Sequence, residues 1–369
     1  MIIDLTKDPV FVERSSSENP KESFENFLSN TVHNCGVEEI AKEASDPPKK
    51  NRFRDFSFLR GNGASSKCKK GELTNKTISS ITRYVKLNDR YIALTSLLTK
   101  SYLYHYVLGD ISSIRDSPEN SESYRKRIRE LPRTASGKPY IPFDESEVSL
   151  LPFNISHQFP FIGLAYLDGS LQSDSYSSIK IGVDIVMFNS YTDTLHLYSS
   201  IHDFLNVFYT SFTSREWDQI QSVSASVGIN GNSARIKEFF IRWSIKEAYT
   251  KALGTGLGTD FRSFDTRLFS EGGTEESQLC RRVLGEESGT HLRGHVVHSG
   301  EKLDEKWDFA FVPLYQGVNG DAQPEAPVGC ACICIGPNEN IDDKSLLQVT
   351  LSSSTLKDLI DYHIDESTR

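Results

Sequence analysis

A glutamate and a lysine stand four residues apart in the segment RWSIKEAYTKALGTGL, residues 242–257. If this segment is helical, Glu247 and Lys251 lie one turn apart on the same side and can reach the same ligand. A carboxylate and an ammonium group together suit a bound metal ion and a negatively charged phosphate group. The ordinary alternative is an exposed ion pair, which this spacing also favours and which stabilises a helix only slightly.

The apolar residues of the same segment predict how the helix packs. At about 100° per residue, four of them fall within about 60° of one another and form a core-facing stripe. These are Ile241, Ile245, Ala248 and Ala252. Glu247 and Lys251 lie roughly 120° and 80° from the centre of that stripe, on a line that also carries Phe240 and Trp243. An exposed ion pair does not explain the two aromatic residues, so the helix has two faces to satisfy, one packed and one partly charged.

Asp184 raises a similar question in the apolar, strand-like segment IGVDIVMF. A buried carboxylate without a partner is strongly destabilising, so Asp184 needs an edge position, an ion pair or a metal ion. If this strand contacts the helix, Asp184 and Glu247 could hold one hard cation together. Mg²⁺ commonly takes one or two carboxylates and completes its shell with water and phosphate oxygens.

Two further segments carry groups that bind phosphate. RTASGKPYIP places Arg133 and Lys138 around a glycine turn, and FNISHQ places Ser156 and His157 at the end of a strand. Guanidinium, ammonium, hydroxyl and imidazole groups all donate hydrogen bonds to phosphate oxygens. Each of these residues, taken alone, also has an ordinary structural explanation.

The spacing of apolar residues predicts the elements that position these groups. Helical spacing covers 87–108 and 194–220, and alternation predicts strands at FIGLAYLDG and IKIGVDIVMF, joined by a hairpin loop. Further strands are expected around 261–269, 292–298, 307–314 and 329–335. This order predicts an α+β fold of two halves, each with a helix packed on an antiparallel sheet.

The polar N-terminal stretch is interrupted by Pro, Ser and Gly and is expected to be poorly ordered, with a short helix near 36–44. The expected divisions are an N-terminal extension over 1–70, a first half over 71–179, and a second half over 180–369 with insertions near 221–235 and 317–329.

The composition limits the class of protein. The chain has 369 residues, 37% of them hydrophobic and 25% charged, and can therefore bury a sizeable core. Its net charge of −9 argues against general nucleic-acid binding, and it has no apolar run long enough for a membrane span. The six cysteines follow no metal-site or disulfide-framework spacing, which favours reduced thiols and a cytoplasmic location. Cys330, Cys332 and Cys334 alternate along a predicted strand and are expected to pack as small apolar residues.

The order of the motifs resembles one family. GKPYIP, FNISH, IGVDIV and RWSIKEAYTKALGTGL, with FTSREW at 212–217, look like successive signatures of the 4′-phosphopantetheinyl transferases of the surfactin-synthetase-activating type. The resemblance covers residues 80–315. Its most specific part is the pattern W-x-x-K-E-A-x-x-K, formed by Trp243, Lys246, Glu247, Ala248 and Lys251.

The resemblance implies that the chain transfers the phosphopantetheine arm of coenzyme A to a serine of an apo carrier protein, releasing adenosine 3′,5′-bisphosphate. Asp184 and Glu247 would bind Mg²⁺, with Mn²⁺ as the alternative, on the coenzyme A diphosphate. Lys251 would contact that diphosphate and stabilise the leaving group. Glu247, directly or through a metal-held water, would be the base for the carrier serine.

The remaining coenzyme A contacts are also implied by the resemblance. Ser156 and His157 would hold the 3′-phosphate, and Arg133 and Lys138 would add positive charge there. Arg90 and Lys100, on the first long helix, align loosely as further basic contacts. The family fold is a pseudodimer of two similar α+β halves with the active site in a cleft between them, and Phe240 and Trp243 would line or support that cleft. Because a chain with both halves needs no partner to complete its site, a monomer is expected.

Val186 departs from the bacterial pattern, in which a second acid often follows two residues after the strand aspartate. An apolar residue at this position is typical of eukaryotic relatives, which implies a metal site with two carboxylates. Such relatives often activate α-aminoadipate reductase in lysine biosynthesis, so the expected partners are apo aminoadipyl, acyl and peptidyl carrier domains.

Two other functions fit parts of the pattern. Another Mg²⁺-dependent phosphoryl or nucleotidyl transferase could use the same acids, but the sequence has no P-loop, and GTGLGTD follows a helix instead of opening one. A decayed transferase that only binds carrier proteins would be expected to lose Asp184, Glu247 or Lys251, and all three are present.

Overall fold

The computed structural model of the chain describes residues 1–5, 8–34, 78–110, 134, 137–142, 150–167, 179–192, 197–223, 231–270, 273–285, 291–298, 301–316, 326–337, 353–354, 357 and 359. It divides into two compact units. The sheet unit comprises residues 1–7 and 132–354, and the helical unit comprises residues 8–131 and 355–369. The expected division into halves at 71–179 and 180–369 stays a prediction.

The helical unit contains α1 (Pro9–Ser15), α2 (Pro20–Asn34) and α4 (Leu87–Asp110), and α4 confirms the helix predicted over 87–108. Asp8 begins α1, because its carboxylate accepts hydrogen bonds from the backbone N–H groups of Val10 and Phe11. The ring of Tyr91 on α4 packs edge-on against Phe11 and Phe24, at centroid distances of 4.9 and 4.6 Å. These aromatic contacts join the three helices.

The N-terminal residues differ from the sequence prediction. Residues 2–34, expected to be poorly ordered, form β1 (Ile2–Asp4), α1 and α2. The physical reason is burial of apolar side chains: Ile3 is buried in β1, and Phe24 and Leu28 lie one helical turn apart on the buried side of α2. The short helix expected near 36–44 lies outside the described residues.

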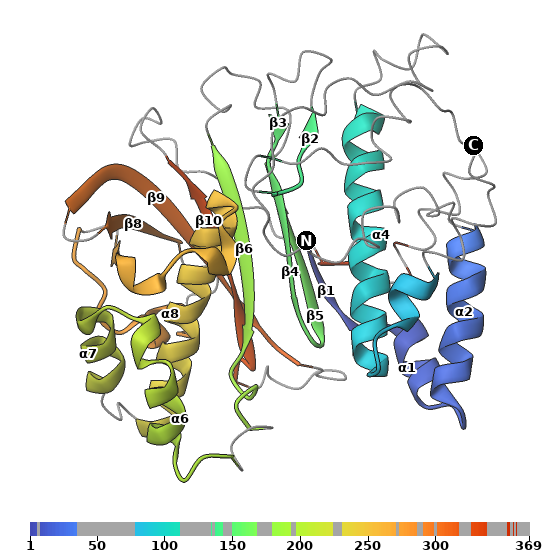
Figure 1. Ribbon diagram of the computed structural model, residues 1–369, viewed down its shortest axis with the longest axis horizontal. Coiled ribbons are helices and arrows are strands. Elements are labelled where there is room, and N and C mark those ends of the chain that lie inside the picture. The colour runs from blue at the N-terminus through green and yellow to red at the C-terminus, as the bar shows by residue number, and fades with distance from the viewer. Residues whose placement is uncertain are drawn as a thin grey trace, which may run out of the picture. The chain divides into compact units, whose positions relative to one another are not determined.

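The sheet unit contains two main sheets (Figure 1). The five-stranded sheet has the order β6-β10-β9-β8-β7 and is antiparallel throughout. Its strands are β6 (Lys180–Met187), β7 (Phe264–Phe269), β8 (His291–His298), β9 (Glu301–Leu314) and β10 (Gly329–Gly336). The mixture of helices and antiparallel strands confirms the α+β class.

The second sheet has the order β11-β1-β5-β4, with β4 (Phe153–Gln158), β5 (Phe161–Tyr166) and β11 (Ser353–Ser354). A separate short pair is formed by β2 (Ile141–Pro142) and β3 (Leu150–Leu151). The hairpin predicted between FIGLAYLDG and IKIGVDIVMF is therefore wrong, because β5 and β6 belong to different sheets. Strand pairing depends on non-local partners, and a polar connecting segment cannot reveal them.

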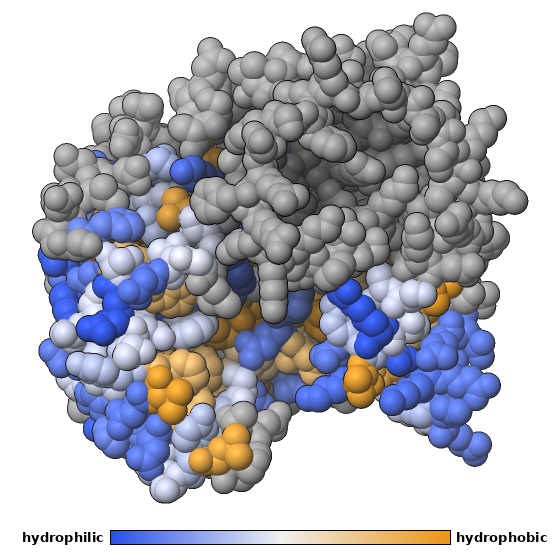
Figure 2. All heavy atoms as spheres, viewed as in Figure 1, coloured by the Kyte–Doolittle hydropathy of each residue, from blue (hydrophilic) through white to orange (hydrophobic). Residues whose placement is uncertain are grey.

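The helical region predicted over 194–220 is also interrupted. It forms α6 (Ile201–Val207), the 3₁₀ turn η7 (Tyr209–Ser211) and α7 (Ser214–Ser222). Thr213 begins a new helix with a capping box. Its hydroxyl accepts a hydrogen bond from the Glu216 N–H, and the Glu216 carboxylate accepts one from the Thr213 N–H. Over α6 and α7 the face in Figure 2 is mostly hydrophilic with some apolar patches. Val207, at the end of α6, is an exposed apolar residue.

Helix α8 (Gly231–Leu253) lies on the five-stranded sheet, with α6 and α7 beside it (Figure 1). It begins inside the stretch assigned to an insertion at 221–235. The predicted core stripe is confirmed, because Ile241, Ile245, Ala248 and Ala252 are all buried. After α8 come the 3₁₀ turns η8 (Gly256–Gly258) and η9 (Phe261–Ser263), and α9 (Leu279–Val283) follows β7.

The cysteines on β10 pack as predicted. Cys330, Cys332 and Cys334 are fully buried in the core beneath α8, and the four cysteines that the structure describes are free thiols. Burial raises the pKa of the Cys330 thiol to about 12 and raises the pKa of the other two strand thiols well above the usual value. These side chains therefore behave as small apolar residues.

Gly182 sets how closely α8 approaches β6. A Cβ atom at this position would lie 2.0 Å from the Ala248 carbonyl oxygen and 2.5 Å from the Ala252 nitrogen. Both obstacles are helix backbone, so no side-chain rotation relieves them. The glycine therefore fixes the spacing between the strand that carries Asp184 and the helix that carries Glu247 and Lys251.

We expect Gly182→Ala to lower the free energy of unfolding by at least about 2 kcal/mol, because α8 must move away from the sheet. Gly258→Ala is the matched control, since a Cβ there meets nothing within 4 Å. Chemical denaturation of both variants measures the difference. Equal stability of the two variants would contradict the close approach.

Candidate active site

Three predicted residues meet within the sheet unit. The Lys251 ammonium lies 2.5 Å from Oδ1 of Asp184 and donates to the Ser156 hydroxyl at 3.0 Å. The Ser156 hydroxyl in turn donates to Oδ1 of Asp184 at 3.2 Å. Strands β4 and β6 and helix α8 each supply one of these three groups.

Burial controls the electrostatics of this cluster. Asp184 is only 7% exposed, and burial raises the pKa of its carboxyl, while the Lys251 charge and hydrogen bond act in the opposite direction. A charge so deeply buried requires a partner, and Lys251 supplies it. The ion pair that the sequence left open as an explanation for Asp184 is present, but its partner is a predicted site residue.

Glu247 lies one helical turn before Lys251 and is half-buried. Burial raises the pKa of its carboxyl, and the nearby negative charge of Asp184 raises it further, against the effect of Lys251. Within the described parts of the chain, the Glu247 carboxylate has no hydrogen bond or ion pair. Glu247 is therefore a carboxylate held close to a second one and available to a ligand.

These two carboxylates fit a hard divalent cation. Burial raises both pKa values, and the charge of Asp184 raises that of Glu247 further; a cation shared by the two carboxylates would relieve this repulsion. Val186 is buried against the α8 core, and among the described residues no group of three acidic, histidine or cysteine side chains converges. Because Lys251 already contacts Asp184, a cation would share that carboxylate with the lysine or displace it.

A second, fully buried ion pair holds α8 in place. The Lys246 ammonium lies 2.9 Å from Oε2 of Glu216 on α7, and it donates to the carbonyl oxygens of Phe261 and Phe264. The other oxygen of Glu216 accepts hydrogen bonds from the N–H and hydroxyl of Thr266 on β7. Every polar atom of the pair is thus satisfied, as burial requires.

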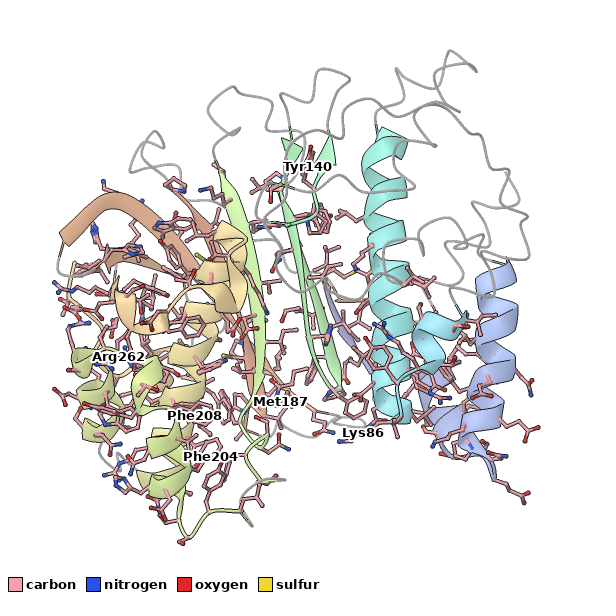
Figure 3. All side chains as sticks on the ribbon, in the orientation of Figure 1. Lys86, Tyr140, Met187, Phe204, Phe208 and Arg262 are labelled. Atoms are coloured by element: carbon pink, nitrogen blue, oxygen red, sulfur yellow. The ribbon has the colours of Figure 1, made fainter. Side chains whose placement is uncertain are left out.

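The aromatic residues on the line of Glu247 and Lys251 support α8. The Trp243 ring packs against Phe208, Phe212 and Phe261 at centroid distances of 5.5, 6.3 and 5.4 Å, and Phe240 is buried in the same core. Phe208 lies beside Phe204 next to α8 (Figure 3). Of the two predicted alternatives, lining or supporting a cleft, these contacts favour support.

Lys138 lies at the junction of β6 and α8. Its ammonium donates to the carbonyl oxygens of Ile181 at 2.6 Å and Ala252 at 3.1 Å. Burial and the nearby charge of Lys180 lower the pKa of Lys138 to about 8. The side chain thus binds the end of α8 beside the close approach at Gly182, and its predicted phosphate contact stays a prediction.

The other predicted contacts belong to the opposite face of a strand, to the helical unit or to residues outside the described ranges. His157 is exposed and lies next to Ser156 in β4, so the two side chains point to opposite faces of the strand. Arg90 and Lys100 belong to the helical unit, where Arg90 binds Glu25 at 2.8 Å and the Tyr84 carbonyl oxygen. Arg133 lies outside the described residues. The roles predicted for these four residues stay predictions.

Sequence reasoning assigned no role to Glu216, Lys246, Asn154 or Gln158, although each makes a specific contact in the sheet unit. A signal for the last two was present, because FNISHQ carries a polar side chain with an oxygen acceptor at every second position. Such alternation places these acceptors on one face of a strand.

Comparison with known proteins agrees with this geometry. Residues 180–312 match the family model of the 4′-phosphopantetheinyl transferase superfamily. The matched range includes Asp184, Glu247 and Lys251. This match confirms the family resemblance found in the motifs.

Several curated proteins are also similar in sequence to part of this chain. The chain is 30% identical over 172 residues to 4′-phosphopantetheinyl transferase pptA of Paxillus involutus, which is 46% of this chain and 58% of the relative. It is 33% identical over 136 residues to L-aminoadipate-semialdehyde dehydrogenase-phosphopantetheinyl transferase of Xenopus laevis, covering 37% and 38%. It is 30% identical over 198 residues to phosphopantetheinyl transferase of a Thraustochytrium species, covering 53% and 59%. The chain thus matches between 38% and 59% of the length of these relatives.

In the part of the chain that the structure describes, no helix is long and apolar enough to cross a membrane.

We expect Lys246→Met to lower the free energy of unfolding by about 3–5 kcal/mol, because Glu216 is left buried without a counter-charge. Lys86→Met, at an exposed lysine, is the matched control. The double variant Lys246→Met/Glu216→Gln should lose less stability than the sum of the two single variants, as measured by chemical denaturation. Additive losses would show that the pair is not coupled.

Lys138 generates a prediction about pH. Its pKa is about 8 in the folded chain against an ordinary value of 10.5, so between these values the unfolded chain holds a proton that the folded chain lacks. The free energy of unfolding of the wild type should therefore rise with pH in this window relative to Lys138→Met. Parallel denaturation series of the two proteins measure this difference, and a difference that stays constant would contradict the lowered pKa.

Proposed function

We propose that the chain transfers the 4′-phosphopantetheine arm of coenzyme A to a serine of an apo carrier protein. The serine oxygen attacks the phosphorus that bears the pantetheine arm, and the bond from that phosphorus to the bridging oxygen of the diphosphate breaks. Adenosine 3′,5′-bisphosphate leaves, and the serine proton passes to a base. The observation that carries this proposal is the convergence of Asp184, Lys251 and Glu247 within the residues that match the superfamily model.

The buried cluster suits a substrate with a diphosphate. The Lys251 ammonium can neutralise charge that develops on the leaving oxygen, and its position is held by Asp184 and Ser156. Asp184 and Glu247 would hold Mg²⁺, or Mn²⁺ as the alternative, and the ion would add neutralising charge at the diphosphate when bound. Low exposure at Asp184 strengthens these interactions, since water screens them poorly there.

Glu247 is the proposed base for the carrier serine, directly or through a water molecule. Its carboxylate is half-buried, has no partner among the described side chains, and has a raised pKa. A raised pKa makes a carboxylate a better proton acceptor near neutral pH. Asp184 is less suited, because Lys251 and Ser156 already occupy one of its oxygens.

We also propose how the chain is organised, which carriers it modifies and where it acts. Ser156 from the first half meets Asp184 and Lys251 from the second half, which supports a pseudodimer with its site between the halves and a chain that acts as a monomer. The names of the relatives support α-aminoadipate reductase as a carrier substrate in lysine biosynthesis, beside other acyl and peptidyl carrier domains. The free, buried thiols support a cytoplasmic location.

The proposal predicts that wild-type protein adds about 340 Da to an apo carrier protein when coenzyme A and Mg²⁺ are present, which is the mass of the transferred arm. Glu247→Gln should lower the rate by about 10²–10⁴-fold through loss of the base. Lys251→Met should also lower it strongly, since it removes the charge at the leaving oxygen. Intact-protein mass spectrometry measures the product.

Glu13→Gln, at an exposed glutamate of α1, is the matched control and should transfer at the wild-type rate. Wild-type protein that binds coenzyme A but modifies none of several unrelated carriers would favour the carrier-binding module. Folded protein that does not bind coenzyme A at all would overturn the proposed function.

A further inference from the structure

Strand β6 is an edge strand, and its free edge is bound by side chains. It pairs with β10 on one side only, so the N–H groups of alternate residues point away from the five-stranded sheet. Such unpaired groups are costly when they are removed from water. The residues that follow in β6 are buried, from Ile181 to Met187.

Three side chains of β4 satisfy these groups. Asn154 Oδ1 accepts a hydrogen bond from the N–H of Val183 at 2.8 Å, and Gln158 Oε1 accepts one from the N–H of Met187 at 3.1 Å. Between them, Ser156 Oγ accepts from the N–H of Ile185 at 3.3 Å. All three pairs are 29 residues apart in sequence, so β4 and β6 run parallel in one fixed register. We call Asn154, Ser156 and Gln158 the acceptor ladder.

The middle member of the ladder belongs to the candidate active site. The Ser156 hydroxyl accepts hydrogen bonds from the Ile185 N–H and the Lys251 ammonium, and it donates one to Asp184. These three bonds use the hydrogen and both lone pairs of the hydroxyl. Any slip of β4 along β6 would break these contacts together. The described hydrogen bonds of Asn154 and Gln158, the outer members, go to the β6 backbone and fix the register on both sides of Ser156.

The amide side chains of Asn154 and Gln158 can satisfy the unpaired N–H groups of β6, which apolar side chains cannot. Each is an amide whose oxygen reaches a backbone N–H across the gap between two strand edges, where an apolar residue would leave that N–H unpaired. Packing alone constrains the register less, because Phe161, Ile185 and Met187 meet as apolar groups without directional bonds. Met187 lies near one end of β6 (Figure 3), so the two amides bracket Asp184.

We propose that Asn154 and Gln158 are positioning residues of the transfer reaction. By holding the N–H groups of Val183 and Met187, they keep β6 in register with β4 and so keep Asp184 in contact with Ser156 and Lys251. This inference rests on the proposed function, because the consequence for catalysis exists only if the cluster performs the transfer.

The test combines kinetics with amide hydrogen exchange on the full chain. Asn154→Leu and Gln158→Met remove the acceptors at similar volume, and Asn154→Asp keeps an oxygen at the same place. In Asn154→Leu the N–H of Val183 should exchange faster, and in Gln158→Met that of Met187 should. In both variants kcat should fall by about ten- to a hundredfold, with the KM for coenzyme A within about twofold of wild type. Asn154→Asp should keep the slow exchange and most of kcat.

Asn189→Leu, at an exposed asparagine just after β6, is the matched control and should change neither measurement. Faster exchange at Val183 and Met187 with wild-type kcat would overturn the positioning role. Unchanged exchange in the apolar variants would overturn the ladder itself. If the wild type transfers nothing, the proposed function fails, while the exchange rates still decide whether the side chains hold β6.

Discussion

The negative charge of a carboxylate on a buried, apolar strand needs a counter-charge or a hydrogen-bond donor, and Asp184 has both. Lys251 approaches from α8 and Ser156 from β4, so the three elements must keep their places for the charge to be tolerated. Burial strengthens the ion pair but also makes it costly to break. The same arrangement brings Glu247 near Asp184, whose charge helps to raise the pKa of the Glu247 carboxyl.

Helix α8 meets this constraint because its two sides are fixed by different means. On the sheet side, Gly182 allows backbone contact with Ala248 and Ala252, and Lys138 binds the carbonyl oxygen at the helix end. On the side of α7, the Lys246–Glu216 pair and the rings around Trp243 prevent rotation. Alignment of strand and helix is thus set by backbone contact and buried charge, which are less yielding than apolar packing.

Local periodicity predicted what depends on local structure. The core stripe of α8 and the burial of the β10 cysteines follow from residue spacing, and Glu247 and Lys251 lie one turn apart on α8 as their spacing predicts. The sequence could not show that β5 and β6 belong to different sheets, because pairing is decided by distant strands. Nor could the sequence show that Lys138 binds β6 and the end of α8, since its partners are backbone carbonyl oxygens, which every residue carries.

The three thiols of β10 have a consequence for the chemistry proposed here. Coenzyme A ends in a thiol, and its disulfide form reacts with proteins by thiol–disulfide exchange, which requires a thiolate on the attacking cysteine. Burial keeps Cys330, Cys332 and Cys334 protonated and out of reach of such reagents. A core rich in sulfur can therefore lie next to Asp184 without forming a mixed disulfide with the coenzyme that the site is proposed to use.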